Sequence, residues 1–319
     1  MKKLLFIIII LCSVSNSFGQ SMRYNLEVGG RMGASNYLGD FGSGDLARGF
    51  IYNLELADTR IMAGVFGRYR FHPLFSYEMA LTYANIQGDD KNSINYERTG
   101  RNLNFTNNMF MMNNKFLYLP PFLHISDIGH TGRYNNEFDA YAFTGVGILY
   151  HNPKAEYMGT NYKLRPLMTE GKRYSPITAT IPMGAGFYIT HVTRKRKRHR
   201  FGFEMGWNLT FTDYLDDVSN EYVDNSQLSA DPMAVTLANR NPELGSYAPG
   251  LYPVSANYGA LVAGVNGSQP NLNKRGDATN KDNYLLISLS YSYVMKTKGS
   301  FARTFGNKNK RRRGGGARF

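Results

Sequence analysis

Basic side chains are concentrated in two short runs of this chain of 319 residues. Seven consecutive residues, Arg194 to Arg200, are Lys, Arg or His, and a second run extends from Lys308 to Arg313. Such clusters attract anionic partners, which can be nucleic acid, lipid phosphates or an acidic protein surface. The candidate partner-binding residues are therefore Arg194, Lys195, Arg196, Lys197, Arg198, Arg200, Lys308, Lys310, Arg311, Arg312 and Arg313.

Catalytic chemistry has little support in the spacing of nucleophiles and bases. The segment His124-Ile125-Ser126 resembles the His-x-Ser pair of barrels that deacylate lipid A, but Asp127 follows where those enzymes have Asn. The strand plan below also places this segment in a turn at the periplasmic end, whereas those enzymes act at the outer leaflet. We expect that the protein is not an enzyme.

Metal and cofactor sites are equally poorly supported. Asp216 and Asp217 are interpreted as solvated loop carboxylates, with a bound cation as the alternative. We expect no cofactor and no resident metal. The remaining histidines lack the spacing of metal ligands: His72, His130, His151, His191 and His199.

The N-terminus is typical of a signal peptide. Lys2 and Lys3 precede the apolar run LLFIIIILC and the polar segment SVSNSFG. The apolar run is much shorter than the ~20 residues that a spanning helix needs. We predict cleavage after Gly19, which would export the chain and remove Cys12, its single cysteine. Export argues against nucleic acid as the partner, and the loss of Cys12 excludes disulfide chemistry.

Period-two alternation dominates the rest of the chain. In RFGFEMGWNLTFT the residues Phe201, Phe203 and Met205 alternate with Gly202, Glu204 and Gly206. The same pattern of large apolar residues on one face, and Gly, Ser, Thr or Ala on the other, is present in FSYEMALTYA and LLISLSYSYVM. Strands of ~10–13 residues with a crowded small-residue face are typical of a narrow membrane barrel. A soluble β-protein is the alternative.

We predict an all-β fold, an eight-stranded antiparallel up-and-down transmembrane β-barrel with a filled, polar interior. The fourth strand alternates least clearly. The predicted strands are 23–36, 59–71, 74–86, 105–119, 138–150, 178–191, 200–213 and 283–296. The predicted domains are a signal peptide over 1–19, the barrel over 20–296 and a basic periplasmic tail over 297–319.

The predicted connections alternate in length, as they do in outer-membrane barrels, where periplasmic turns are short and outer loops are long. The basic run 194–200 and both chain ends then lie on the periplasmic side. The short connections are 72–73, 120–137 and 192–199, and the long ones are 37–58, 87–104, 151–177 and 214–282.

The small-residue face of the strands also carries charges. If this face lines the lumen, its acids and bases should pair, because an unpaired buried charge is costly. We therefore predict that Arg31, Arg68 and Arg70 share acidic partners and occlude the lumen. The predicted lumen network is Glu27, Arg31, Arg68, Arg70, Glu78 and Glu204.

The first strand and the loop after it read LEVGGRMGASNYLGDFGSGD. This segment resembles the opening signature of the PorG-like outer-membrane barrels of the type IX secretion system, in which a glycine-containing strand leads into a G-x-S-x-Y-x-G-D run. RNLNF at 101–105 is a second similarity. The residues that carry the signature here are Gly33, Ser35, Tyr37, Gly39 and Asp40.

The resemblance implies a non-enzymatic component of a protein secretion and gliding machine in the outer membrane, with both termini in the periplasm. It implies a periplasmic ring as partner, built from a PorK-like lipoprotein and a PorN-like protein. Three alternatives come from other classes: a small porin, an outer-membrane lipid enzyme, and a passive OmpA-like anchor whose basic ends bind lipid phosphates or peptidoglycan.

Overall fold

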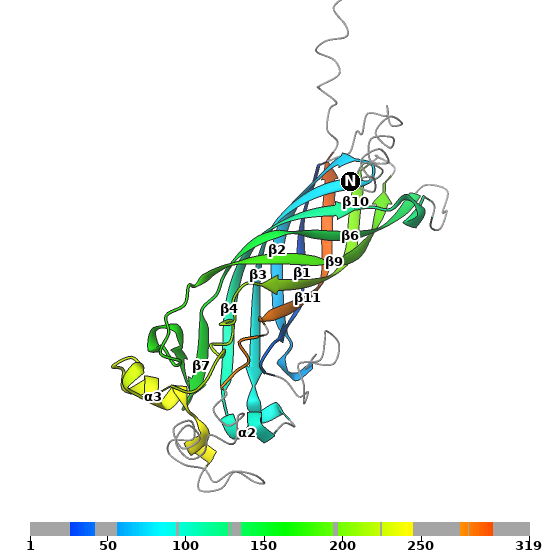
Figure 1. The fold of residues 1–319 in the computed structure, drawn as a ribbon. Coiled ribbons are helices and arrows are strands. Elements are labelled where there is room, and N and C mark those ends of the chain that lie inside the picture. Colours follow the sequence, from blue (N-terminus) through cyan, green and yellow to red (C-terminus); the bar gives the residue numbers. More distant parts are fainter. Residues whose placement is uncertain are drawn as a thin grey trace, which may run out of the picture.

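The computed structural model describes residues 26–41, 56–93, 96–126, 128, 135–193, 197–223, 225–244, 275–279 and 281–295. Eight long strands in this part of the chain form one closed antiparallel barrel (Figure 1). Each strand pairs with its neighbours in chain order, and β11 closes the barrel on β1. The barrel strands are β1 Leu26–Leu38, β2 Arg60–His72, β3 Phe75–Asp89, β4 Asn104–Tyr118, β6 Asn135–Tyr150, β9 Ile177–Val192, β10 Arg198–Thr210 and β11 Asn283–Met295.

The eight-stranded antiparallel barrel predicted from the sequence is confirmed. The fourth strand, whose pattern was weakest, is as regular as the others. Met109, Met111 and Lys115 point inward in β4, while Phe110 and Phe116 point outward. Methionine on the inward face and asparagine on both faces blur the alternation in the sequence.

The strand register sets the width of the barrel. A path through paired Cα positions starts at Leu26, goes once around the barrel and returns to β1 at Asn36, ten residues further along. Eight strands with this stagger tilt by about 40° and enclose a lumen just wide enough for side chains to fill.

Inward-facing glycines let the strands approach closely. At Gly33 an added Cβ would collide with the backbone carbonyl of Ile287 on β11. The outward face carries the large apolar residues; Met32 and Ile61, for example, are 70% and 74% exposed. The described residues contain no helix that is long and apolar enough to cross a membrane.

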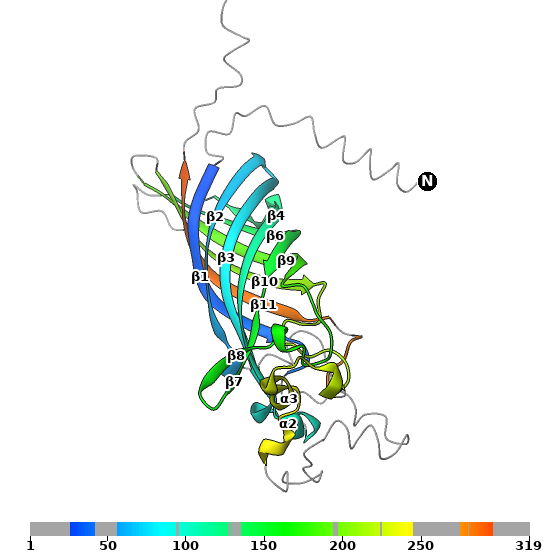
Figure 2. The same cartoon turned by 90° about the vertical axis from the view of Figure 1, so that its left-hand side faces the viewer.

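The two ends of the barrel differ. At one end β1 begins, β11 ends, and the connections are short, including the 3₁₀ helix η4 Pro121–Leu123 and the edge strand β5 His124–Ile125. At the other end the long connections pack together into a cap (Figures 1 and 2). The elements of the cap are η2 Leu56–Asp58, η3 Asp90–Asn92, α2 Tyr96–Arg101, β7 Pro153–Tyr157, β8 Thr160–Lys163, η5 Arg165–Leu167, η6 Asn225–Gln227, α3 Pro232–Ala238 and η7 Asn241–Leu244.

The cap has a hydrophobic core that is continuous with the adjoining end of the barrel. Phe41 and Phe105 pack with ring centroids 4.9 Å apart. Leu215, Val218 and Leu237 from the loop after β10 are buried in the same cluster. The long loops are therefore a folded layer over one mouth of the barrel, an arrangement that the strand pattern did not predict.

Candidate functional site: the lumen and the two ends of the barrel

The predicted charge network lies in the middle of the lumen. Arg31 Nη1 donates to Glu204 at 2.6 Å, and its Nη2 donates to Glu78. Arg68 Nη2 donates to Glu78 at 2.7 Å, and Arg68 Nη1 lies 3.4 Å from Glu27 Oε1. Glu78 is 0% exposed, so it is held by arginines from β1 and β2 without contact with solvent.

Two further cations complete the network. Lys115 Nζ on β4 donates to Glu204 at 2.5 Å, and the Arg200 guanidinium on β10 pairs with Glu27. Lys115 was missed because the alternation in β4 is blurred. Arg200 is four residues before Glu204 in the same strand and therefore lies on the same face, and this alternation could have placed it in the lumen.

Arg200 was assigned to the basic partner-binding set, and that assignment is wrong. Its side chain is buried inside the barrel, because residue 200 already belongs to β10 and points inward. Arg70 also differs from the prediction: its Nη2 donates to the carbonyl of Pro73 in the turn after β2. None of the ion pairs between described residues includes Arg70.

Cations outnumber acids in this buried network. The described members are four bases and three carboxylates, and aromatic ring faces lie against the bases. Lys115 Nζ lies 4.4 Å from the ring centre of Phe143, and the Arg200 guanidinium lies 4.2 Å from that of Tyr188. Tyr141 donates to Glu204 at 3.0 Å. Ionised and aromatic side chains therefore fill the lumen at this level.

Two described residues of the predicted basic surface, Lys197 and Arg198, lie at the end with short connections. Val192 and Arg198 are paired where the β9–β10 turn begins and ends, and Lys197 in that turn is exposed. Arg198 forms an ion pair of 3.2 Å with Glu137 on β6. Residues 194–196 and 308–313 of the predicted set lie outside the described residues.

The same end holds the His124 segment. His124 Nδ1 lies 2.9 Å from Asp139 Oδ1, which joins β5 to β6. The histidine is half exposed, and the aspartate is buried.

The signature residues cluster at the capped end. Ser35 is buried, and its hydroxyl lies 3.2 Å from the carbonyl oxygen of Arg60 and also contacts that of Asn85, so it can donate to one of the two. Tyr37 is also buried, and its hydroxyl contacts Asp216 and Asp282. An added Cβ at Gly39 would collide with the Tyr37 hydroxyl, so the glycine leaves room for this contact. Asp40 accepts a hydrogen bond from Asp277 N at 2.9 Å.

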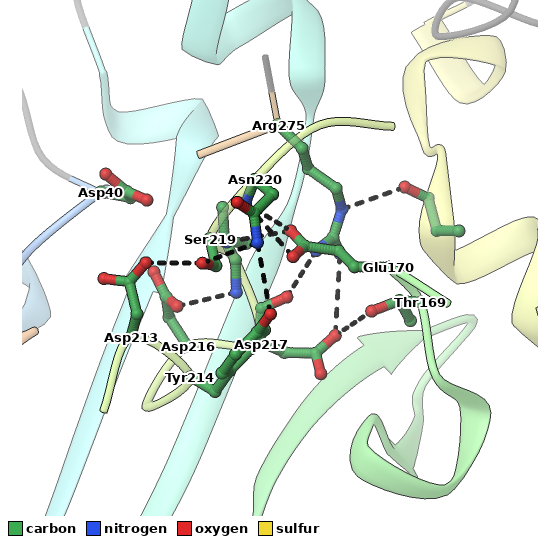
Figure 3. A network of polar contacts seen from close by, with 12 residues as sticks. Asp40, Thr169, Glu170, Asp213, Tyr214, Asp216, Asp217, Ser219, Asn220 and Arg275 are labelled. Atoms are coloured by element: carbon green, nitrogen blue, oxygen red, sulfur yellow. Dashed lines mark hydrogen bonds and ion pairs between the residues drawn. The ribbon is translucent and has the colours of Figure 1, made fainter. Parts of the chain in front are cut away.

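The cap contains further ion pairs. Arg275 donates to Glu170 at 3.0 Å and lies 3.7 Å from Asp217, which joins three segments that are distant in the sequence (Figure 3). Arg101 on α2 donates to Asp90 at 2.7 Å within the β3–β4 connection, and it also donates to the carbonyl of Arg275 at 2.5 Å. Arg275 and Arg101 therefore link the connections before β11, after β8 and between β3 and β4.

The interpretation of Asp216 and Asp217 as solvated carboxylates is wrong. Both are 1% exposed, because the loop after β10 packs into the cap, where the neighbouring Leu215 and Val218 belong to the hydrophobic core. Burial raises the pKa of Asp217 to about 6, although Arg275 acts in the opposite direction. Burial also raises the pKa of Asp213 to about 6. In the described parts of the chain, no group of three or more His, Cys, Asp or Glu side chains is arranged to hold a metal ion.

The family comparison covers most of this fold. Residues 2–231 match the model of a domain of unknown function, DUF6089. The chain belongs to this family. The DUF6089 match takes in the barrel from β1 to β10 together with much of the cap, and it ends before β11. A comparison with curated proteins gave no match.

Proposed function

We propose that this DUF6089 protein is a non-enzymatic outer-membrane barrel subunit of a type IX-like protein secretion and gliding machinery. In this proposal the barrel docks onto a periplasmic ring, made of a PorK-like lipoprotein and a PorN-like partner, through its basic end. The barrel and its family fit such a protein, and the signature from Gly33 to Asp40 supports it through the resemblance described above.

One observation carries the proposal: the chain enters and leaves the barrel at the end where the basic turn lies, and the lumen behind that end is filled. Leu26, Met295 and the paired residues Val192 and Arg198 are all at this end. A filled lumen argues against a diffusion pore. The barrel end that carries the basic turn is then available for contact with another protein, and clustered positive charge would speed and orient that contact.

The outward face supports a membrane location. Strands of 13 to 16 residues carry exposed apolar side chains, and aromatic residues such as Tyr69, Tyr118 and Tyr293 lie near the short-turn end. Apolar bands ~25 Å tall with flanking aromatic girdles are typical of outer-membrane barrels.

The test neutralises the basic end and leaves the lumen intact. One variant carries Gln in place of Arg194, Lys195 and Arg196. A second variant carries Gln in place of Arg311, Arg312 and Arg313. Arg198 and Arg200 are left unchanged because they pair with Glu137 and Glu27. We expect both variants to insert normally but to lose co-purification with the ring and protein secretion, most strongly when combined, because several weak charge contacts act together.

The matched control makes the same kind of change at the other end of the barrel. Lys91, Lys172 and Arg173 are exposed residues of the cap, and changing them to Gln should leave ring binding unchanged. Normal ring binding by correctly inserted basic-end variants would contradict docking. It would favour the passive-anchor alternative, in which the same charges contact anionic lipid at about 1 kcal/mol each.

A further inference from the structure

The Tyr37 hydroxyl joins three segments where the barrel meets the cap. It lies 2.6 Å from Asp216 Oδ2 and also contacts Asp282 Oδ1. It accepts a third hydrogen bond, from Asp40 N, at 3.0 Å. Tyr37 belongs to β1, Asp216 to the loop after β10, and Asp282 to the segment just before β11. This hydroxyl is therefore a point of attachment between the loops and the strands.

The hydrogen bonds around Tyr37 require one proton more than two ionised carboxylates and a phenol would supply. A phenol has one hydrogen, so Tyr37 can donate to only one of its two carboxyl partners. If both carboxyls were ionised, the other carboxylate oxygen would face a phenol lone pair at hydrogen-bond distance. That contact becomes favourable only if this carboxyl carries a proton and donates it to Tyr37.

The second oxygen of each carboxyl is already committed. Asp216 Oδ1 accepts from Val218 N at 2.8 Å, and Asp282 Oδ2 accepts from Leu215 N at 2.9 Å. Rotating either carboxyl away from Tyr37 would break one of these bonds to a buried backbone N–H. The arrangement around the hydroxyl is therefore held from both sides.

Nearby cations do not replace the proton. Among the ion pairs between described residues, none includes Asp216 or Asp282: Arg101 pairs with Asp90, and Arg275 pairs with Glu170. The charged groups that face the two carboxyls are Asp40, which faces both, and Asp213, which faces Asp282. Further out, Arg101, Arg98 and Asp277 face Asp40, and Lys281 and Glu170 face Asp213.

We propose that Tyr37, Asp216 and Asp282 hold one proton at neutral pH in addition to the phenolic hydrogen, and that this added proton holds the cap onto the barrel, so that raising the pH loosens the cap. The inference is independent of the proposed docking function because it concerns the opposite end of the barrel.

The electrostatics agree with the hydrogen-bond count. Burial, followed by repulsion from neighbouring carboxylates, raises the pKa of both Asp216 and Asp282 well above the ordinary value. An unfolded aspartate loses its proton near pH 4. The folded cap therefore holds a proton that the unfolded chain has released, and the stability of the cap falls as pH rises above about 4 until the shared site ionises.

The test replaces one carboxyl by an amide that carries its own hydrogen. Asp282→Asn and Asp216→Asn can each donate an N–H to Tyr37 while still accepting from the backbone. In the unaltered chain we expect hydrogen-exchange protection of 211–223, 275–279 and 281–282 to fall about tenfold or more, relative to the barrel strands, between about pH 6 and pH 9. In each single Asn variant this fall in protection between pH 6 and pH 9 should be mostly absent.

The matched control is Asp231→Asn. Asp231 is an exposed aspartate of the same cap that accepts from Met233 N at 2.9 Å at the start of α3. This variant should keep the pH dependence of the unaltered chain. An equal pH dependence in Asp282→Asn and in the control would overturn the proposal.

A second measurement does not need the variants to fold. Infrared spectra of the unaltered barrel at neutral pH should show the carbonyl band of a protonated, buried carboxyl, and this band should disappear at high pH. A spectrum without the band would overturn the shared proton. Loss of cap protection on addition of a chelator would also overturn it, because a metal ion would then be holding the carboxylates together.

Discussion

The lumen and the capped mouth of the barrel both bury several carboxylates, but they neutralise them differently. In the lumen Glu27, Glu78 and Glu204 face bases from four strands, and cations are in excess. At the capped mouth Asp216 and Asp282 meet around the hydroxyl of Tyr37. A guanidinium keeps its charge at any pH at which a protein is folded, whereas a shared proton does not. The barrel wall should therefore be insensitive to pH across a range in which the cap responds.

The largest expected effect comes from removing an acid of the lumen. Glu78→Gln leaves Arg31 and Arg68 buried with one fewer carboxylate and increases the excess of positive charge. Breaking one partner of a buried ion pair typically costs 3–5 kcal/mol. We expect a decrease of about that size in the free energy of unfolding of the barrel, measured by denaturant titration in micelles. A decrease in the free energy of unfolding below ~1 kcal/mol would mean that water or rearranged neighbours solvate the arginines. The lumen would then not depend on fixed ion pairs, and its contrast with the capped mouth would be contradicted.

An intermediate effect is expected at the mouth. Tyr37→Phe removes the hydroxyl from Asp216, Asp282 and the Asp40 N–H, and leaving buried polar groups without partners costs about 1–3 kcal/mol. The loss should appear in the hydrogen-exchange protection of the cap and leave the barrel strands unchanged. Tyr284→Phe is the control, because the buried Tyr284 hydroxyl donates to the sulfur of Met111, at 2.9 Å, and also faces Thr180, and neither partner is charged. Equal losses in the two variants would indicate a general packing effect.

The smallest effect is expected at the barrel end with the short connections. Glu137→Gln breaks the ion pair with Arg198, whose side chain is 27% exposed. Partly exposed pairs contribute about 0–1 kcal/mol, because water screens them. Denaturant titration should therefore give nearly the same free energy of unfolding as for the unaltered chain. A loss as large as that from Glu78→Gln would show that the Glu137–Arg198 pair is as shielded from water as the ion pairs of the lumen are.

The alternation of side chains along each strand explains how much of the lumen network could be predicted from the sequence. Because side chains alternate across a strand, assigning Glu204 inward also places Gly202, Gly206 and Arg200 inward. The Arg200 error came from reading a dense basic run as one surface, although the strand begins inside it. Lys115 could not be placed with the same certainty, because the neighbouring methionines and asparagines in β4 occupy both faces.

The sequence by itself determined the fold class, the eight strands, the alternation of short and long connections and the inward orientation of Glu27, Arg31, Arg68, Glu78 and Glu204. These features follow from local periodicity, which each segment carries within itself. Only the tertiary structure decided that Arg31 bridges Glu78 and Glu204, and that Tyr37 meets Asp216 and Asp282. Those contacts join residues 47 to 245 positions apart in the chain. They depend on the ten-residue stagger of the closed barrel and on how the long loops fold over its mouth, which a periodic pattern does not encode.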